Sequence, residues 1–186
     1  MYSQHKSYLD GFTLIELLVA IVVLGVLLGI ALPSYQTTVK NNCLTTNTNT
    51  MVTSFQQARS EAVKRKTRIR ITAANSGDNT NEWGKGWNVT IDEDANSNGV
   101  LDTNEDFDGD GVLDGAALFR TVTLSCDTTT IDGADGVTFY QYGSDGFIDK
   151  AGTFDVCDDR TGEQGRQVTI NAVGRPNTNS AYGGCG

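Results

Sequence analysis

Apolar and polar positions follow different patterns in successive parts of the 186-residue chain. From Leu17 to Leu32 every residue is apolar or glycine, with no charge and no proline. Together with 12–15, this run is long enough to cross a bilayer core of about 30 Å as one helix. Further along, apolar residues recur at helical spacing, which predicts that the helix continues and packs one side against another element. These positions are Leu44, Met51, Phe55, Ala58 and Ala62.

Beyond Thr67 the helical spacing changes to the two-residue alternation of β-strands, with Asp-Gly and Gly-Ser turns between the runs. Trp83 and Trp87 are expected in the core or on a sheet face rather than in a ligand platform. The predicted strands cover 68–72, 87–92, 117–124, 136–141, 153–157 and 167–173. The chain is therefore expected to have an α+β fold, with a long N-terminal helix followed by β-sheet.

One carboxylate, Glu16, lies near the start of the apolar run. An ionisable side chain in a membrane segment is costly, because lipid cannot replace its hydration, so Glu16 is a functional candidate. A secretory signal has its small-residue cleavage site after the apolar region, whereas here the small residue, Gly11, comes before it. Cleavage after Gly11 would leave the helix on the mature protein and create an amine at Phe12, about one helical turn from Glu16. The alternative is a plain signal anchor in which Glu16 has no role.

The segment Gly11-Phe12-Thr13-Leu14-Ile15-Glu16 and the apolar helix after it resemble the class III leader of the type IV pilin superfamily, which includes the pseudopilins of type II secretion. The resemblance implies a type IV pilin-like fold, in which the helix packs on an antiparallel β-sheet head with disulfides. It also implies cleavage between Gly11 and Phe12 by prepilin peptidase, N-methylation of Phe12 and assembly through the apolar helix. Glu16 would then neutralise the Phe12 amine of a neighbouring subunit, since opposite charges attract strongly in a low dielectric.

Two further segments resemble the FimT and GspH branch of this superfamily, which contains minor pilins and minor pseudopilins. They are 58–65, at the end of the predicted helix, and 166–175, around the last predicted strand. Some FimT-type minor pilins bind DNA through a Gly-Arg-x-Arg motif at the second place. Gly174 and Arg175 match this motif, but Asn177 stands where the second arginine would be. DNA binding is therefore kept only as an alternative.

The one cluster of cations in the chain contains Lys64, Arg65, Lys66, Arg68 and Arg70. Cations at the C-terminus of a helix offset its macrodipole, so we expect a capped, solvated helix end. The alternative is a binding patch for DNA phosphates, together with the Arg175 noted above, or for an acidic partner. The net charge of −9 argues against general binding of nucleic acid or of anionic membranes.

The only histidine, His5, lies in the predicted leader. The mature chain then has no imidazole for a nucleophile, a general base or a zinc site, and we expect no enzymatic activity. Four cysteines in an exported head predict two disulfides. Of the three pairings we favour Cys157 with Cys185, which would attach the C-terminal tail to a strand, and this leaves Cys43 with Cys126. The other two pairings stay open.

Residues 94–105 have the spacing of an EF-hand calcium loop, the strongest independent motif in the chain. Calcium takes about six to eight oxygen ligands, Gly99 permits the sharp turn, and a glutamate at the twelfth position can bind through both oxygens. A second, overlapping pattern follows, with Ala117 in place of the twelfth-position glutamate. The candidate ligands are Asp94, Asn96, Asn98, Val100, Asp102 and Glu105 in the first pattern and Asp106, Asp108, Asp110, Val112 and Asp114 in the second.

The interval 92–114 contains nine carboxylates and no lysine or arginine. Mutual repulsion would oppose a compact loop unless a cation neutralised it. We therefore expect Ca²⁺ to rigidify an extracellular insertion at 92–117. The alternative is an acidic, solvated loop that binds no metal.

The sequence thus predicts a leader peptide at 1–11, a membrane or filament-core helix at 12–40 and a globular head at 41–186. We expect a minor type IV pilin, anchored in the inner membrane with its head in the periplasm and processed by prepilin peptidase. It would then assemble with other pilin subunits into a pilus at the cell surface, or prime one. The alternatives are a minor pseudopilin of type II secretion and a surface subunit that binds DNA or an adhesion target.

Overall fold

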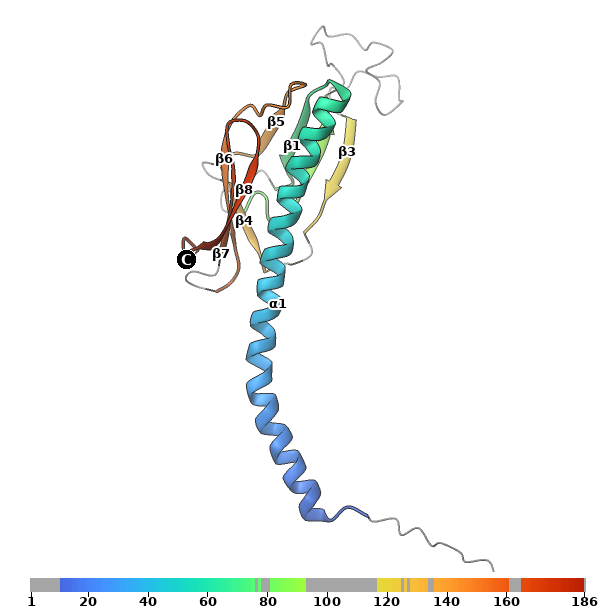
Figure 1. Ribbon diagram of the computed structural model, residues 1–186, viewed down its shortest axis with the longest axis vertical. Coiled ribbons are helices and arrows are strands. Elements are labelled where there is room, and N and C mark those ends of the chain that lie inside the picture. Colours follow the sequence, from blue (N-terminus) through green and yellow to red (C-terminus); the bar gives the residue numbers. More distant parts are fainter. Residues whose placement is uncertain are drawn as a thin grey trace, which may run out of the picture. The chain divides into compact units, whose positions relative to one another are not determined.

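The computed structural model describes residues 11–75, 77, 81–92, 117–124, 126, 128–133, 136–160 and 165–185. The chain divides into two compact units, Met1–Val39 and Lys40–Gly186. One helix, α1 (Leu14–Arg65), runs from the first unit into the second without interruption, through Pro33 (Figure 1). We call the second unit the head.

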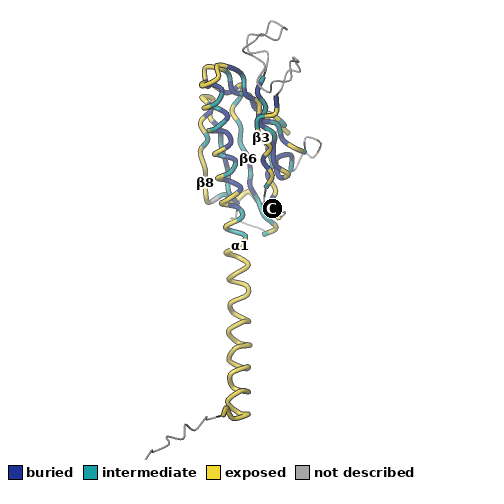
Figure 2. The backbone as a smooth tube through the Cα atoms, turned by 90° about the vertical axis from the view of Figure 1, so that its right-hand side faces the viewer, coloured by how far each residue is buried: buried dark blue, intermediate teal, exposed yellow. Residues whose placement is uncertain are grey.

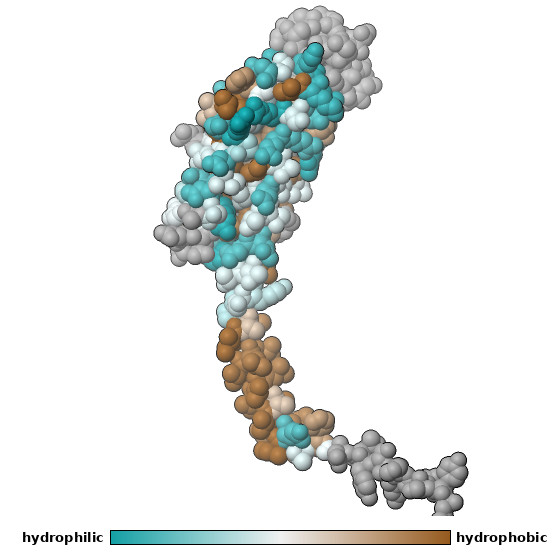
Figure 3. Space-filling model, viewed as in Figure 1, coloured by the Kyte–Doolittle hydropathy of each residue, from teal (hydrophilic) through white to brown (hydrophobic). Residues whose placement is uncertain are grey.

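In the first unit, every residue of α1 up to Val39 is exposed (Figure 2). From Leu17 to Leu32 its surface is hydrophobic, as the brown colour in Figure 3 shows, whereas residues 34–38 are mostly polar. Exposing a helix that is apolar on all sides to water is unfavourable, so such a helix requires lipid or other protein around it. By length and composition, α1 is the one helix among the described residues that could cross a membrane.

In the head, α1 is amphipathic. All five positions predicted to form its packed side are buried, which confirms the helical spacing found in the sequence. Asn47 and Thr48 lie on the same buried side, and the Thr48 hydroxyl donates to the Leu44 carbonyl at 2.6 Å. The opposite side is exposed, as the alternation of blue and yellow along the tube shows (Figure 2).

The first sheet has four antiparallel strands in the spatial order β3, β2, β1 and β5 (Figure 1). Their bounds are Ala117–Val122 for β3, Trp87–Ile91 for β2, Ile69–Ala73 for β1 and Phe139–Tyr142 for β5. All four were predicted, although β5 begins at Phe139 rather than at 136. In β1 and β2, alternate residues are buried, so one face of this sheet contributes to the core.

The second sheet has four antiparallel strands in the order β4, β6, β7 and β8. Their bounds are Thr130–Gly133 for β4, Gly152–Cys157 for β6, Gly165–Ile170 for β7 and Pro176–Tyr182 for β8. The sequence predicted β6 and β7 but neither edge strand. The architecture confirms the α+β prediction of a long helix and antiparallel sheets.

Phe55 of α1 connects the two sheets in the core. Its ring centroid lies 5.7 Å from that of Tyr140 in the first sheet and 5.5 Å from that of Phe154 in the second. Trp83 also packs on Phe154, with centroids 5.1 Å apart. Trp83 and Trp87 are both fully buried, which confirms them as core residues. The helix and both sheets therefore share one aromatic core.

Candidate functional site

The start of α1 positions the two residues expected to direct assembly. Phe12 is 85% exposed, and Glu16 lies in the first turn of the helix. The Thr13 hydroxyl accepts a hydrogen bond from the Glu16 backbone N–H at 3.3 Å. A Thr with Glu three residues later is the pattern of a capping box, and a carboxylate there also complements the helix macrodipole. This capping pattern was not predicted, although the spacing of Thr13 and Glu16 in the sequence indicates it.

The predicted cationic cluster at the other end of α1 makes several contacts within the head. Arg65 Nε lies 2.8 Å from Glu61 Oε2, and Arg68 Nε lies 2.7 Å from Asp92 Oδ2. The hydrogen bond from Arg65 lowers the pKa of Glu61 below its ordinary value, against a smaller opposing effect of desolvation. These cations stabilise the helix end and its connection to β1.

The remaining cations of the cluster belong to different elements, since Arg70 lies in β1 and Lys64 and Lys66 lie at or just after the end of α1. Arg70 donates from Nε and Nη2 to Gln141 Oε1, at 3.2 and 3.0 Å, on the outer face of the first sheet. Lys64 is 73% exposed, and Lys66 is an exposed residue with a φ of 56° just after the helix. Arg175 is exposed in the turn between β7 and β8, in the other sheet. A nucleic-acid surface that combines these residues stays a hypothesis.

The candidate calcium ligands from Asp94 to Asp114 lie outside the described residues. The ends of this segment are described. Ile91 of β2 pairs with Ala117 of β3, so the segment leaves and rejoins the sheet at neighbouring positions. The Asp92 N–H donates to the Arg68 carbonyl at 2.9 Å. In the described part of the chain, no group of three or more His, Cys, Asp and Glu residues could hold a metal ion.

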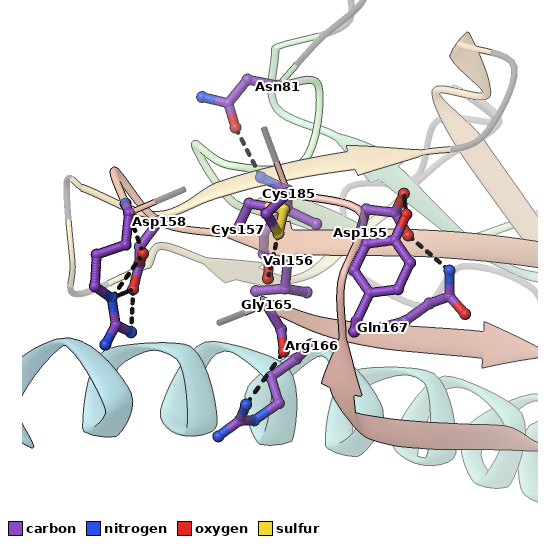
Figure 4. Close-up of a disulfide and its surroundings, with 12 residues drawn as sticks. Asn81, Asp155, Val156, Cys157, Asp158, Gly165, Arg166, Gln167 and Cys185 are labelled. Atoms are coloured by element: carbon purple, nitrogen blue, oxygen red, sulfur yellow. Dashed lines mark hydrogen bonds and ion pairs between the residues drawn. A yellow bond between two sulfur atoms is a disulfide. The ribbon is translucent and has the colours of Figure 1, made fainter. Parts of the chain in front are cut away.

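Two disulfides stabilise the head, Cys43–Cys126 and Cys157–Cys185, which are the pairs favoured from the sequence. Their Cα–Cα distances are 5.9 and 5.7 Å, within the usual range. The first joins α1 to the segment after β3. The second joins the end of β6 to the C-terminal segment (Figure 4). The first bond therefore attaches a connecting segment to α1, and the second attaches the C-terminal segment to β6.

A polar cluster at the first turn of α1 in the head was not predicted. Arg160 donates from Nε and Nη2 to the Asp158 carboxylate and from Nη2 to Asn41 Oδ1 at 2.9 Å. Lys40 Nζ lies 2.7 Å from the Asp159 carboxylate. Burial raises the pKa of Asp158, but the bonds from Arg160 outweigh this and hold it below its ordinary value. The cluster attaches the connection between β6 and β7 to α1.

Two family models match this chain. The family described as type II transport protein GspH matches residues 47–174, more than half of the chain, and the prokaryotic N-terminal methylation motif matches residues 10–32. The chain belongs to the GspH family. As a GspH-family protein, it is a subunit of the minor pilin and pseudopilin class, and this class assembles with other pilin subunits.

Solved structures agree with the fold of this GspH-family chain. It is similar to the type IV minor pilin FimU of Pseudomonas aeruginosa in space group P21, at 24% identity and a TM-score of 0.54, over 75% of this chain and 90% of that one. The P65 crystal form gives 25% identity and a TM-score of 0.50, over 73% and 92% of the two chains. Among curated protein sequences, none matches the chain.

Proposed function

We propose that the chain is a minor type IV pilin that is cleaved between Gly11 and Phe12 by prepilin peptidase and assembled through its apolar helix. The observation that carries this proposal is the wholly exposed apolar part of α1, with Phe12 and Glu16 at its start. Burying one Leu, Ile or Val side chain is worth about 1.5–3 kcal/mol. A helix with so many exposed apolar side chains is therefore stable only in lipid or among other helices.

Two environments satisfy this requirement in turn. Before assembly, the helix crosses the inner membrane once and the head lies in the periplasm. After assembly, the same side chains pack against the helices of other subunits. The Glu16 carboxylate is costly in both settings unless a cation neutralises it, and cleavage supplies one at the Phe12 amine of a neighbouring subunit.

Substitution of Gly11 tests the cleavage step without disturbing the fold. A Cβ added at Gly11 meets no atom within 4 Å, and the same holds for Gly77 in the head. Gly11→Leu should leave the precursor uncleaved, in the membrane and absent from sheared filaments, whereas the matched control Gly77→Leu should be processed and assembled. The readouts are the mass of the N-terminal peptide and the filament fraction. Normal processing of Gly11→Leu would contradict the proposal.

A second candidate is a minor pseudopilin of type II secretion, which the description of the matching family favours. Deletion followed by complementation separates the two. A pilus subunit predicts loss of surface pili with normal release of secreted proteins. A pseudopilin predicts normal pili with loss of that release.

We propose further that Ca²⁺ binds residues 94–114 and stabilises the head. The support is the spacing of Asp94, Asn96, Asn98, Asp102 and Glu105, together with the charge of the interval. Calorimetry on the compact unit Lys40–Gly186 should give a saturable heat with a Kd of about 10⁻⁴–10⁻³ M and a higher Tm in Ca²⁺ than in chelator. Glu105→Gln should weaken this response, and Asp145→Asn, in a turn of the head, should not. Absence of heat and of a change in Tm would reduce the segment to an acidic loop.

A further inference from the structure

The two disulfides divide the head into consecutive parts of the chain. Cys43 pairs with Cys126 and Cys157 pairs with Cys185, so each cysteine is bonded to a neighbour in cysteine order. The first bond closes a ring that contains β1, β2 and β3, and the second closes a ring that contains β7 and β8. Neither ring contains a cysteine of the other bond. Of the three possible pairings, the native one therefore joins the cysteines in the order in which they occur.

The fold also brings Cys126 toward Cys157, which is not its partner. In the register of β4 and β6, Thr130 lies opposite Cys157, and the N–H of the preceding Thr129 donates to the Cys126 carbonyl at 3.3 Å. The turn that starts at Cys126 therefore ends beside Cys157. Loop closure also favours this non-native pair, because the chain between its cysteines is shorter than the 83 residues that separate Cys43 from Cys126. Proximity alone thus does not explain why Cys126 is bonded to Cys43.

The cysteine side chains have little access to other proteins once the head has folded. Cys185 is 6% exposed, and the other three cysteines are partly buried. Thiol–disulfide exchange requires direct attack of a thiolate on a disulfide sulfur, so its rate depends on access to that sulfur. An enzyme that oxidises these cysteines therefore acts best before the core around them closes. At that stage the order in which the cysteines emerge can select the pairs.

We propose that a thiol–disulfide oxidase forms the two bonds in chain order as the head is exported, and that no later isomerisation is needed. Cys43 is the first cysteine after the apolar segment that stays in the membrane. At roughly 5–20 residues per second, Cys126 is synthesised about 4–17 s after Cys43 and ahead of Cys157. Cys126 is therefore bonded to Cys43 before Cys157 can compete. The inference rests on the proposed function, because only an exported head meets such an oxidase.

Each bond forms by a two-electron exchange. The Cys43 thiolate attacks the disulfide of the oxidase, which gives a mixed disulfide and releases one oxidase sulfur as a thiolate. The Cys126 thiolate then attacks the Cys43 sulfur, so the Cys43–Cys126 bond forms and the second oxidase sulfur leaves. Two thiols of the chain are oxidised, the oxidase disulfide is reduced to a dithiol, and the two protons pass through solvent to the oxidase sulfurs. Cys157 and Cys185 react in the same way with a second oxidase molecule.

Two single substitutions in the full chain, expressed in a host strain that lacks its disulfide isomerase, test the order. Cys43→Ser makes Cys126 the first thiol to emerge, so the non-native Cys126–Cys157 bond should increase by about tenfold or more over the wild-type chain. The matched control is Cys185→Ser, in which Cys43–Cys126 should form as in the wild type and Cys157 should have no partner within the chain. Peptide masses after thiol alkylation and non-reducing digestion identify the bonds, so the readout does not require that a variant folds.

The outcomes separate the inference from the function on which it rests. In the same strain, the wild-type chain should contain both native bonds at an unchanged level. Mispaired bonds in the wild-type chain, or a Cys157–Cys185 bond with a free Cys126 in Cys43→Ser, would overturn the inference and leave the proposed function intact. Four free thiols in the wild-type chain, in cells whose oxidase is intact, would contradict an exported head and therefore the proposed function.

Discussion

The Thr13 hydroxyl accepts a hydrogen bond from the backbone N–H of Glu16, so Thr13 caps the first turn of α1, which contains Glu16. The Thr13 and Glu16 spacing fits a capping box, and the proposed function gives the Glu16 carboxylate a second, separable role as the charge partner of the Phe12 amine. A capping box accepts Gln in place of Glu, whereas only a carboxylate can neutralise an amine. The two roles can be tested by different substitutions.

Glu16→Gln should retain the helix start and lose assembly, because the amide carries no charge. Thr13→Ala should weaken the helix start by about 1 kcal/mol, because it removes the capping oxygen, and should retain assembly, because the charge remains. The filament fraction and the mass of the mature N-terminus report both effects. Normal assembly of Glu16→Gln would contradict a role for the Glu16 charge, because the amide retains the capping function and lacks only the charge.

Arg160→Ala should destabilise the head by about 2 kcal/mol, because it leaves the Asp158 carboxylate buried without its main partner. The matched control is Lys40→Ala, which breaks a pair with Asp159, a side chain that is 57% exposed. The control should cost less than about 1 kcal/mol, because water screens that pair. Chemical denaturation of Lys40–Gly186 measures both. Equal losses would contradict the assignment of the buried pair as the stronger contact.

The pH dependence of the Arg160→Ala effect follows from the lowered pKa of Asp158. The stabilisation is fully present above the ordinary carboxyl pKa of 3.8 and is lost as the pH falls toward the lower pKa of the folded state. The difference in unfolding free energy between wild type and Arg160→Ala should therefore be constant near neutral pH and shrink below about pH 4. A difference that grows in acid would show that another group controls it.

Loss of either disulfide should destabilise the head, and loss of Cys43–Cys126 should cost more. The two bonds close sequence separations of 83 and 28 residues, which corresponds to a difference of about 1 kcal/mol in the chain-entropy estimate. Paired Cys→Ser variants at each bond, compared by chemical denaturation, measure this. A larger loss from the Cys157–Cys185 pair would show that its local contacts outweigh the entropy of loop closure.

Phe55→Ala should be among the most destabilising single changes in the head, by about 3–5 kcal/mol, because it leaves a cavity between α1 and both sheets. Phe55→Leu should cost less, since it retains most of the buried apolar volume. The difference should be visible in the Tm of Lys40–Gly186. Equal effects would indicate that the aromatic contacts, rather than the filled volume, determine stability at this position.

The predicted elements were those that carry strong periodic patterns. The packed side of α1 from Leu44 to Ala62 could be predicted because apolar residues repeat at helical spacing, and β1 and β2 because apolar residues alternate. The edge strands β4 and β8 could not. β4 has only four residues and ends in Asp-Gly, and β8 begins with a proline and contains two asparagines, which are typical of loops. β8 forms because it pairs with β7, a contact that local sequence does not contain.

The residues of the candidate site also divide into those that local sequence predicts and those that only the folded chain brings together. Gly11, Phe12 and Glu16 could be predicted because their spacing is local, and they lie within the matched N-terminal methylation motif at residues 10–32. The contact of Arg160 with Asn41 could not, since these residues lie 119 positions apart and meet only in the folded head. The cations at the end of α1 and in β1 form a cluster in the sequence, but their partners depend on the fold. Arg68 pairs with Asp92, and Arg70 donates to Gln141 of β5.

The proposed function requires that the mature chain begins at Phe12 and is assembled through its apolar helix. The most direct measurement is the mass of the N-terminal peptide of this chain, taken from purified filaments and from membranes of the same cells. We predict that the filament form begins at an N-methylated Phe12 and that any uncleaved precursor is confined to the membrane. A filament form that begins at Met1, or a Phe12 form that never leaves the membrane, would contradict the account.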